Sequence, residues 1–309
     1  MSLSLQIVVS GLAAGGVYGL FAIAHAVIYR LTGVVNLAFG DLVALGVYVT
    51  LVAAAGTGPV SATNVGGLRF ALALAVGLLV CVAAGAGTYV AAVQPYVERG
   101  RAIGWVAATA ALAFAVHALL AGVSSAQVFP DPLRLDRIGR GGVVTIAGAS
   151  VQIRSFFVLA VALVLAAAAT AFLSRSRIGK GMRAIADDAA AARTIGVPVD
   201  RLLTLAFALA GAVAALGAIA AAPGAPFDAD TGTLLGVKGL IAALAVRFGP
   251  PWQALAAGLV LGLGEAVLAN AELGGHALAP GWSQVLPIAA VLAFLAVRPP
   301  RVALEAVPE

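Results

Sequence analysis

Charged residues are scarce in this sequence: Lys, Arg, Asp and Glu make up 10% of its 309 residues, whereas hydrophobic residues make up 62%. A soluble chain of this size cannot bury so much apolar surface, which excludes the ordinary soluble classes. The apolar runs are continuous and do not alternate, so a transmembrane β-barrel is disfavoured as well. The composition therefore predicts an all-α, polytopic bundle of transmembrane helices.

Reactive side chains are few as well. The single cysteine, Cys81, excludes a disulfide within the chain, and no HExxH, CxxC or paired-carboxylate spacing indicates a metal or catalytic centre. The RIGKG segment at 177–181 lacks the upstream glycine and the Ser or Thr of a nucleotide-binding loop. The ionisable residues of the apolar runs lie in five different runs and are His25, Asp41, His117, Lys238 and Glu265. We therefore expect no enzymatic activity, no cofactor and no metal.

Nine apolar runs are candidates for crossing the bilayer. They lie at about 5–29, 34–55, 70–93, 103–122, 155–173, 202–222, 232–247, 252–270 and 283–297. Eight or ten crossings remain possible, because short or broken segments are easily miscounted. No soluble domain interrupts these runs, so residues 1–309 are expected to form one transmembrane domain. Its longest loops are 123–154 and 174–201.

The distribution of cations predicts the orientation. With nine crossings and a cytosolic C-terminus, twelve of the eighteen Lys and Arg residues lie on the cytosolic side, and six of these are in 174–201. This bias places the 174–201 loop in the cytosol and the 123–154 loop outside. The net charge of +5 needs no nucleic-acid partner, since the cations gather at span ends. In the external loop, the alternating run 143–153 predicts a small hairpin or a surface helix.

The 174–201 segment is the one charge-rich interruption between long apolar runs. Its alanine-rich stretch 182–195 contains no Gly or Pro and predicts a single short helix, ended by Gly196 and Pro198. A narrow apolar stripe at helical spacing consists of Met182, Ile185, Ala189 and Ala192. The pattern leaves two interpretations open: a solvated loop on the lipid headgroups, or a docking helix for a cytosolic partner.

Polar residues inside apolar runs are candidates for the solute path. Asn36 and Asp41 lie close behind Gly33, a pattern that indicates either a broken helix facing a cavity or a cap at the start of the second span. Glu265 lies deeper in its run, where a carboxylate either faces a wet path or bonds to a neighbouring helix.

Glycines recur at four-residue spacing in two of the runs. The first set is Gly11, Gly15 and Gly19, and the second is Gly258 and Gly262. Small residues at this spacing let two helices approach closely, so we expect them at tight helix contacts in a compact bundle.

Three blocks, at 11–49, 177–218 and 258–269, are distinctive in combination. The most specific positions in the central block are Arg177, Gly179, Arg183, Ala184, Asp187, Ala191, Gly196 and Phe207. In this order the blocks resemble the permease subunits of branched-chain amino acid (Liv-type) ABC importers, a family that also includes urea- and amide-type importers. The resemblance implies a type II importer fold. It further implies that the residues coupling the chain to an ATPase are Arg177, Gly179, Arg183, Ala184, Asp187 and Gly196.

The resemblance also implies a set of partners in a bacterial inner membrane. Cytosolic ABC ATPase subunits would dock on 174–201, a second permease chain (a paralogue or an identical copy) would complete the path, and an extracytoplasmic solute-binding protein would deliver the solute. Branched-chain amino acids or a related small polar solute are expected, with urea or amides as the alternative. A stand-alone secondary transporter or channel is the alternative of another class, with coupling ions at Asp41 or Glu265.

The sequence departs from the family pattern at two places. The family often has a histidine before the glycine of the segment that reads Asn36-Leu37-Ala38-Phe39-Gly40 here. Between the late spans, where the family commonly has a glycine-rich turn, residues 245–251 carry an arginine and two prolines. These departures bear on the substrate more than on membership of the family.

Overall fold

The computed structural model describes residues 2–55, 67–97, 104–124, 143–146, 149–221, 229–273, 276–277 and 280–297. Its first half contains α1 (Ser2–Thr32), α2 (Phe39–Ala55), α3 (Gly67–Thr88), the π-helical turn η1 (Tyr89–Val93), α4 (Gln94–Val97), α5 (Gly104–Ser124) and α6 (Ile153–Arg175). Its second half contains α7 (Arg177–Asp187), α8 (Ala189–Thr194), α9 (Val199–Ala221), α10 (Ala229–Ala245), α11 (Pro251–Ala269) and α12 (Pro280–Val297). Two small antiparallel hairpins are β1 (Val143–Ile146) with β2 (Ala149–Gln152), and β3 (Glu272–Leu273) with β4 (His276–Ala277).

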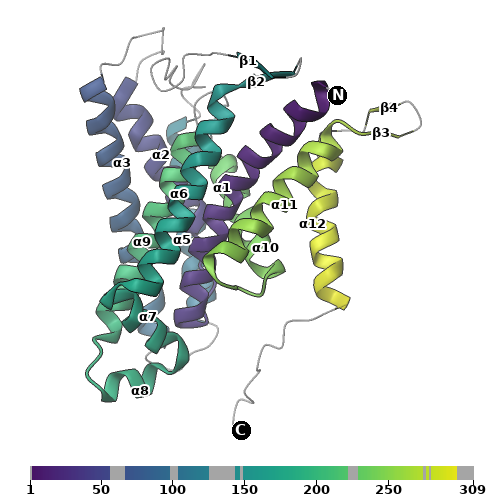
Figure 1. Ribbon diagram of the computed structural model, residues 1–309. Coiled ribbons are helices and arrows are strands. Elements are labelled where there is room, and N and C mark those ends of the chain that lie inside the picture. The colour runs from purple at the N-terminus through teal and green to yellow at the C-terminus, as the bar shows by residue number, and fades with distance from the viewer. Residues whose placement is uncertain are drawn as a thin grey trace.

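The predicted all-α membrane bundle is confirmed, and each of the nine apolar runs contains a helix (Figure 1). Six helical segments within the described residues are long and apolar enough to cross a bilayer: Leu5–Thr32, Leu68–Val97, Gly104–Val123, Ile153–Arg175, Val199–Ala221 and Pro251–Ala269. The remaining three are α2 and α10, of 17 residues each, and α12, which has 18 residues and an internal proline, Pro287. Where nine crossings were predicted, the described residues thus contain six helical segments of spanning length and three further apolar helices.

Helix α1 forms the centre of the bundle and packs against α6, α9, α10 and α11. Leu20, Phe21 and Ala22 in its middle are fully buried. The predicted glycine contacts are confirmed, since a Cβ on Gly15 would lie 2.7 Å from the carbonyl oxygen of Gly258 in α11. The two backbones touch directly there, so a larger side chain would push α1 and α11 apart.

After α1 the chain turns back into the bundle before α2 begins. Gly33 takes the left-handed conformation, with φ of +68°, which a residue with a Cβ adopts only at a cost. The ring of Phe39, the first residue of α2, lies 5.8 Å from that of Phe21 and 5.0 Å from that of His25. Helix α2 thus starts beside the middle of α1, and the intervening Asn36 is buried.

The two ends of the bundle carry different elements (Figure 1). Helices α7 and α8 project from one end, and the start of α1 and the β1–β2 hairpin lie at the other. The hairpin confirms the expectation for 143–153, with Val143 paired to Gln152, and buried Val151 packs against Val9 of α1. Residues 125–142 of the predicted external loop lie outside the described residues, as do Arg99, Arg101, Arg298 and Arg301 of the orientation argument. Which end faces the cytosol remains a prediction.

Candidate functional site

The charge-rich loop folds into two short helices, which corrects the prediction of one helix at 182–195. Helix α7 begins at Arg177, because the Ser176 hydroxyl accepts a hydrogen bond from the N–H of Gly179 at 2.8 Å. It stops at Asp187 because the carboxylate of Asp188 accepts the N–H groups of Ala190 and Ala191 at 2.8 and 2.9 Å and so starts α8. An N-cap residue therefore breaks a stretch whose helix propensity is otherwise uniform.

Gly196 ends α8, as predicted. Its φ of +84° is left-handed, and its N–H bonds to the carbonyl oxygen of Arg193 at 3.1 Å. Arg193 also forms a salt bridge of 2.9 Å to Asp200 in the first turn of α9, with both side chains about half exposed. The turn that returns the chain to the bundle is thus fixed by backbone conformation and by one ion pair.

One side of α7 and α8 packs on the bundle. Met182, Ile185 and Ala192 of the predicted apolar stripe are buried, whereas Ala189 is exposed because the break at Asp188 changes the register. Gly179 is buried too, and a Cβ there would lie 2.6 Å from the Cα of Leu173 in α6. Its role is therefore a close backbone approach between α7 and α6, not a contact with solvent.

The opposite side of α7 is open and charged. Arg177 is exposed there and Ala184 is half-buried, while exposed Arg183 and Asp187 lie at the edge of this side, next to the transmembrane helices. The guanidinium of Arg183 donates to the carbonyl oxygen of Ser174 at 3.0 Å, which ties α7 to the last turn of α6. This side offers donors and acceptors to a partner, while its anchor on α6 connects it to a transmembrane helix.

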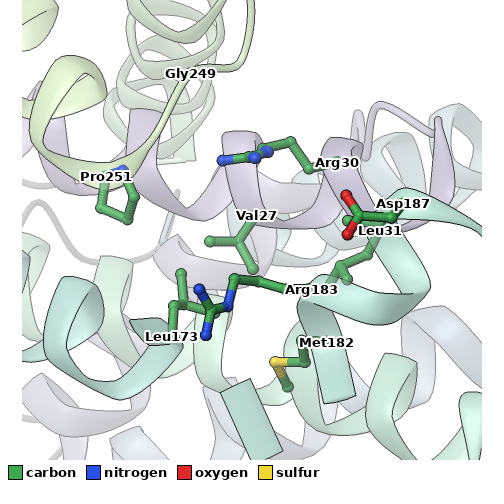
Figure 2. Close-up of a pocket in the computed structure, with 10 residues that line it drawn as sticks. Val27, Arg30, Leu31, Leu173, Met182, Arg183, Asp187, Gly249 and Pro251 are labelled. Carbon is green, nitrogen blue, oxygen red and sulfur yellow. The ribbon is translucent and has the colours of Figure 1, made fainter. Parts of the chain in front are cut away.

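A pocket of about 110 Å³ lies where α7 meets the transmembrane helices (Figure 2). Its lining comes from the end of α1, the end of α6, helix α7 and the turn before α11 and consists of Val27, Arg30, Leu31, Leu173, Met182, Arg183, Ala186, Asp187, Gly249 and Pro251. Arg30, Arg183 and Asp187 bring charges to a mainly apolar wall. In the adjoining turn, Arg247 and Phe248 both have φ of 53°, and the Phe248 ring stacks on Tyr29 with centroids 3.9 Å apart. The pocket is thus a joint between α7 and three transmembrane elements.

A polar cluster joins α2, α5 and α10. The Asp41 carboxylate accepts the Thr233 hydroxyl at 2.6 Å, and the same oxygen lies 3.3 Å from Nδ1 of His117. The other ring nitrogen of His117 lies 3.6 Å from Asp230. Asn36 lies just before this cluster in the chain, and its side-chain oxygen accepts the N–H of Ala38 at 3.1 Å. The Asn36 side chain thus stabilises the turn that leads into α2 within the bundle, which agrees with the predicted cap near the start of the second span.

A second polar cluster holds α1, α10 and α11 together. Glu265 faces Lys238, whose Nζ lies 2.9 Å from Oε1 and 3.0 Å from Oε2. The Tyr18 hydroxyl donates to Oε2 at 2.8 Å and accepts from Lys238 at 3.1 Å. Of the two alternatives for Glu265, the bond to a neighbouring helix is the one that the geometry provides.

These pairings could not be predicted from the sequence, because only the fold brings together the runs that contain Tyr18, His117, Thr233 and Lys238. Lys238 is buried in the bundle, which its run alone does not predict. The one signal available was that a charge inside an apolar run needs a partner. Among the described residues no group of three or more His, Cys, Asp or Glu side chains is arranged to hold a metal ion.

Comparison with known proteins identifies the family of this chain. Residues 7–295 match the family described as "Branched-chain amino acid transport system / permease component". The chain belongs to this permease family. It is therefore a non-catalytic transport subunit of a branched-chain amino acid-type ABC transport system, and permeases of such systems act with ATPase and binding-protein partners.

Individual relatives agree with this assignment. The permease is 26% identical over 268 residues to the high-affinity branched-chain amino acid transport system permease protein BraD of Pseudomonas aeruginosa, covering 85% of each chain. It is 25% identical over 266 residues to LivH of Escherichia coli K12, again covering 85% of each chain. A solved metal-chelate type ABC transporter in an inward-facing conformation matches with a TM-score of 0.52 and 14% identity, over 96% of this chain and 88% of the other. That likeness shows an ABC-transporter permease-like fold and nothing finer.

Proposed function

We propose that this permease moves branched-chain amino acids, or a closely related small polar solute, across a bacterial inner membrane, driven by a separate ATPase. The relatives that it matches over 85% of its length carry that function in their names. The observation that carries the proposal is the α7–α8 element, which leaves the bundle between α6 and α9 with its apolar side seated and its charged side open.

In this proposal the ATPase docks on the open side of α7 and α8. Arg177, Arg183 and Asp187 provide the polar contacts, and half-buried Ala184 keeps the surface between them shallow. Gly179 and Gly196 act through shape, since one lets α7 lie against α6 and the other lets the chain return to α9. Movement of α7 would reach α6 through the bond between Arg183 and Ser174.

The pocket of Figure 2 extends this coupling to the rest of the bundle. Because its wall includes the end of α1 and the turn before α11, a shift of α7 would act on both helices at once. When ATP binding brings the paired ATPases together, the packed helices would tilt as rigid bodies. Such a two-state motion opens the solute path first to one side of the membrane and then to the other. A second permease chain would complete that path, and a solute-binding protein outside would supply the solute.

Asn36 and Asp41 are assigned to the path and Glu265 to the structure that supports it. Asp41 belongs to a cluster whose other members are partly exposed, whereas Glu265 is matched by Lys238. A stand-alone ion-coupled transporter is the weaker alternative, because Glu265, one of its two candidate ion ligands, already has a cation, and Asp41, the other, is bonded to Thr233 and His117.

The test is assembly and coupling with the ATPase and binding protein in proteoliposomes. Arg183→Glu reverses the charge on the proposed docking side, and Gly196→Val removes the left-handed turn. Both should reduce co-purification of the ATPase and solute-stimulated ATP hydrolysis, while the permease itself still folds. Arg201→Glu is the matched control, since it reverses an exposed arginine of the same loop outside α7 and α8. If both test variants kept unchanged ATPase attachment and unchanged solute-stimulated hydrolysis, the proposed docking surface would be contradicted.

A further inference from the structure

The cluster around Asp41 changes from exposed to buried along its length. The Asp230 side chain is 88% exposed, His117 is 35% exposed and Asp41 is 3% exposed. Thr233 bridges the last two, with its hydroxyl 2.6 Å from Asp41 and 3.3 Å from the His117 ring. The four residues thus form a continuous polar line that leads from the surface of the chain into the bundle.

The inner end of this line lies deep along the bundle axis. Asp41 is in the first turn of α2, which begins at Phe39 beside Phe21, and Phe21 is eleven residues, or about 16 Å, from the end of α1. Helix α10 runs in the same direction as α1, because Gly239 packs on Phe21 while Gly249 lines the same pocket as Arg30. Asp230 and Thr233 therefore lie on the side of Phe21 toward the start of α1, away from α7.

Lipid is a poor neighbour for this line. A carboxylate or a polar histidine that faces hydrocarbon is strongly disfavoured, so such groups face a partner or water. The pair formed by Lys238 and Glu265 is matched and buried, whereas the Asp41 cluster has two carboxylates and one histidine and remains open at Asp230. The two clusters are thus chemically different, and only the Asp41 cluster has both an accessible end and excess negative charge.

We propose that Asp41, His117, Thr233 and Asp230 form a binding station for the ammonium group of a zwitterionic solute on its way through the permease. This rests on the proposed function and adds a substrate chemistry to it. The ammonium carries three donors and one positive charge, which suits carboxylate oxygens and a hydroxyl. It would bind at Asp230 first and then replace the imidazole beside Asp41. Binding remains weak because His117 competes as a partner for both carboxylates.

Cysteine chemistry tests the station in the full chain, reconstituted in lipid nanodiscs. Leu234 is 38% exposed and four residues from Asp230, which places the two on one face of α10. Leu234→Cys is treated with two thiosulfonate reagents of similar size, one carrying an ammonium and one a sulfonate. The parent chain, with only buried Cys81, and Leu79→Cys on an exposed apolar part of α3 serve as controls.

The ammonium reagent should modify Leu234→Cys about tenfold faster than the sulfonate reagent, because nearby negative charges raise the local concentration of cations. Adding Asp230→Asn should remove most of that preference, and neither control should show it. Equal rates for the two reagents, or no reaction of Leu234→Cys with either, would overturn the station. Leucine should also slow the ammonium reagent, whereas its amino-free keto acid should not. Since attachment of the ATPase is measured separately, a failed station and a failed docking surface give different results.

Discussion

Lys238 of α10 and Glu265 of α11 form a salt bridge inside the bundle, with the two side chains only 5% and 12% exposed. The Lys238 ammonium also lies 4.9 Å from the centre of the Tyr18 ring, so α1 takes part in the same contact. Helix α1 and the consecutive helices α10 and α11 thus share one matched pair of charges. Such a pair fixes which faces of the helices meet, because any other rotation leaves a charge unpaired.

The first prediction is that breaking this pair harms the protein more than removing it. Glu265→Gln leaves the Lys238 ammonium buried without a counter-charge, which costs about 3–5 kcal/mol in buried pairs of this type. We expect lower expression and a clearly lower melting temperature in detergent. The double variant Lys238→Met with Glu265→Leu removes both charges and should recover much of that loss. Wild-type melting of Glu265→Gln would make the salt bridge incidental.

The second prediction concerns the contact between α1 and α11. Gly258→Leu places a side chain where the Gly19 backbone already lies, and Gly262→Leu does the same against Gly15. Both substitutions should push the two helices apart. We expect aggregation in size-exclusion chromatography and a lower melting temperature in thermal scans. Gly264→Ala is the matched control in the same helix, since its nearest neighbour would lie 3.9 Å away. Equal behaviour of the three variants would contradict the close packing.

Much of the helical fold could be predicted from the sequence, because apolar runs and small-residue spacing are local signals. The contact of Gly15 with Gly258 is an example, since four-residue glycine spacing already indicated close helix contacts. Span length was less predictable. Helix α2 begins inside the bundle at Phe39, and hydropathy alone cannot place a helix start along the axis of a fold that it does not know.

The candidate sites divide in the same way. The left-handed turn at Gly196 followed from residue type, and the cap by Asp188 could have been found from the rule that Asp favours helix starts. The pairings of Asp41 with His117 and of Lys238 with Glu265 could not, since each joins two different apolar runs, with a separation of 76 residues in the first pair and 27 in the second. Partner choice among buried charges is a property of the packed bundle, not of any run.

The third prediction is that α7 and α8 face the cytosol. Ile195 is 75% exposed and next to the turn at Gly196, so Ile195→Cys presents a thiol without disturbing a buried contact. In a Cys81→Ser background, an impermeant thiol reagent should leave this residue unmodified in intact cells and modify it after permeabilisation. The six cations of the loop are the physical reason, as positive loops stay inside. Strong labelling of intact cells would reverse the orientation.

The last prediction concerns the break between α7 and α8. The carboxylate of Asp188 holds two N–H groups, those of Ala190 and Ala191, and Asp188→Ala removes both hydrogen bonds. Loss of an N-cap costs about 1 kcal/mol, and a helix of six residues has little else to hold it. Amide hydrogen exchange at Ala190 to Ala192 should therefore rise about fivefold, while exchange in α9 stays the same. Asp188→Ser should keep most of the protection, because a hydroxyl can cap as well. Asp187→Ala removes the neighbouring carboxylate and leaves the cap, so it should not change exchange in α8. If Asp188→Ala and Asp187→Ala behaved alike, the break would come from the packing of Met182 and Ala192 on the bundle, and the cap would not be its cause.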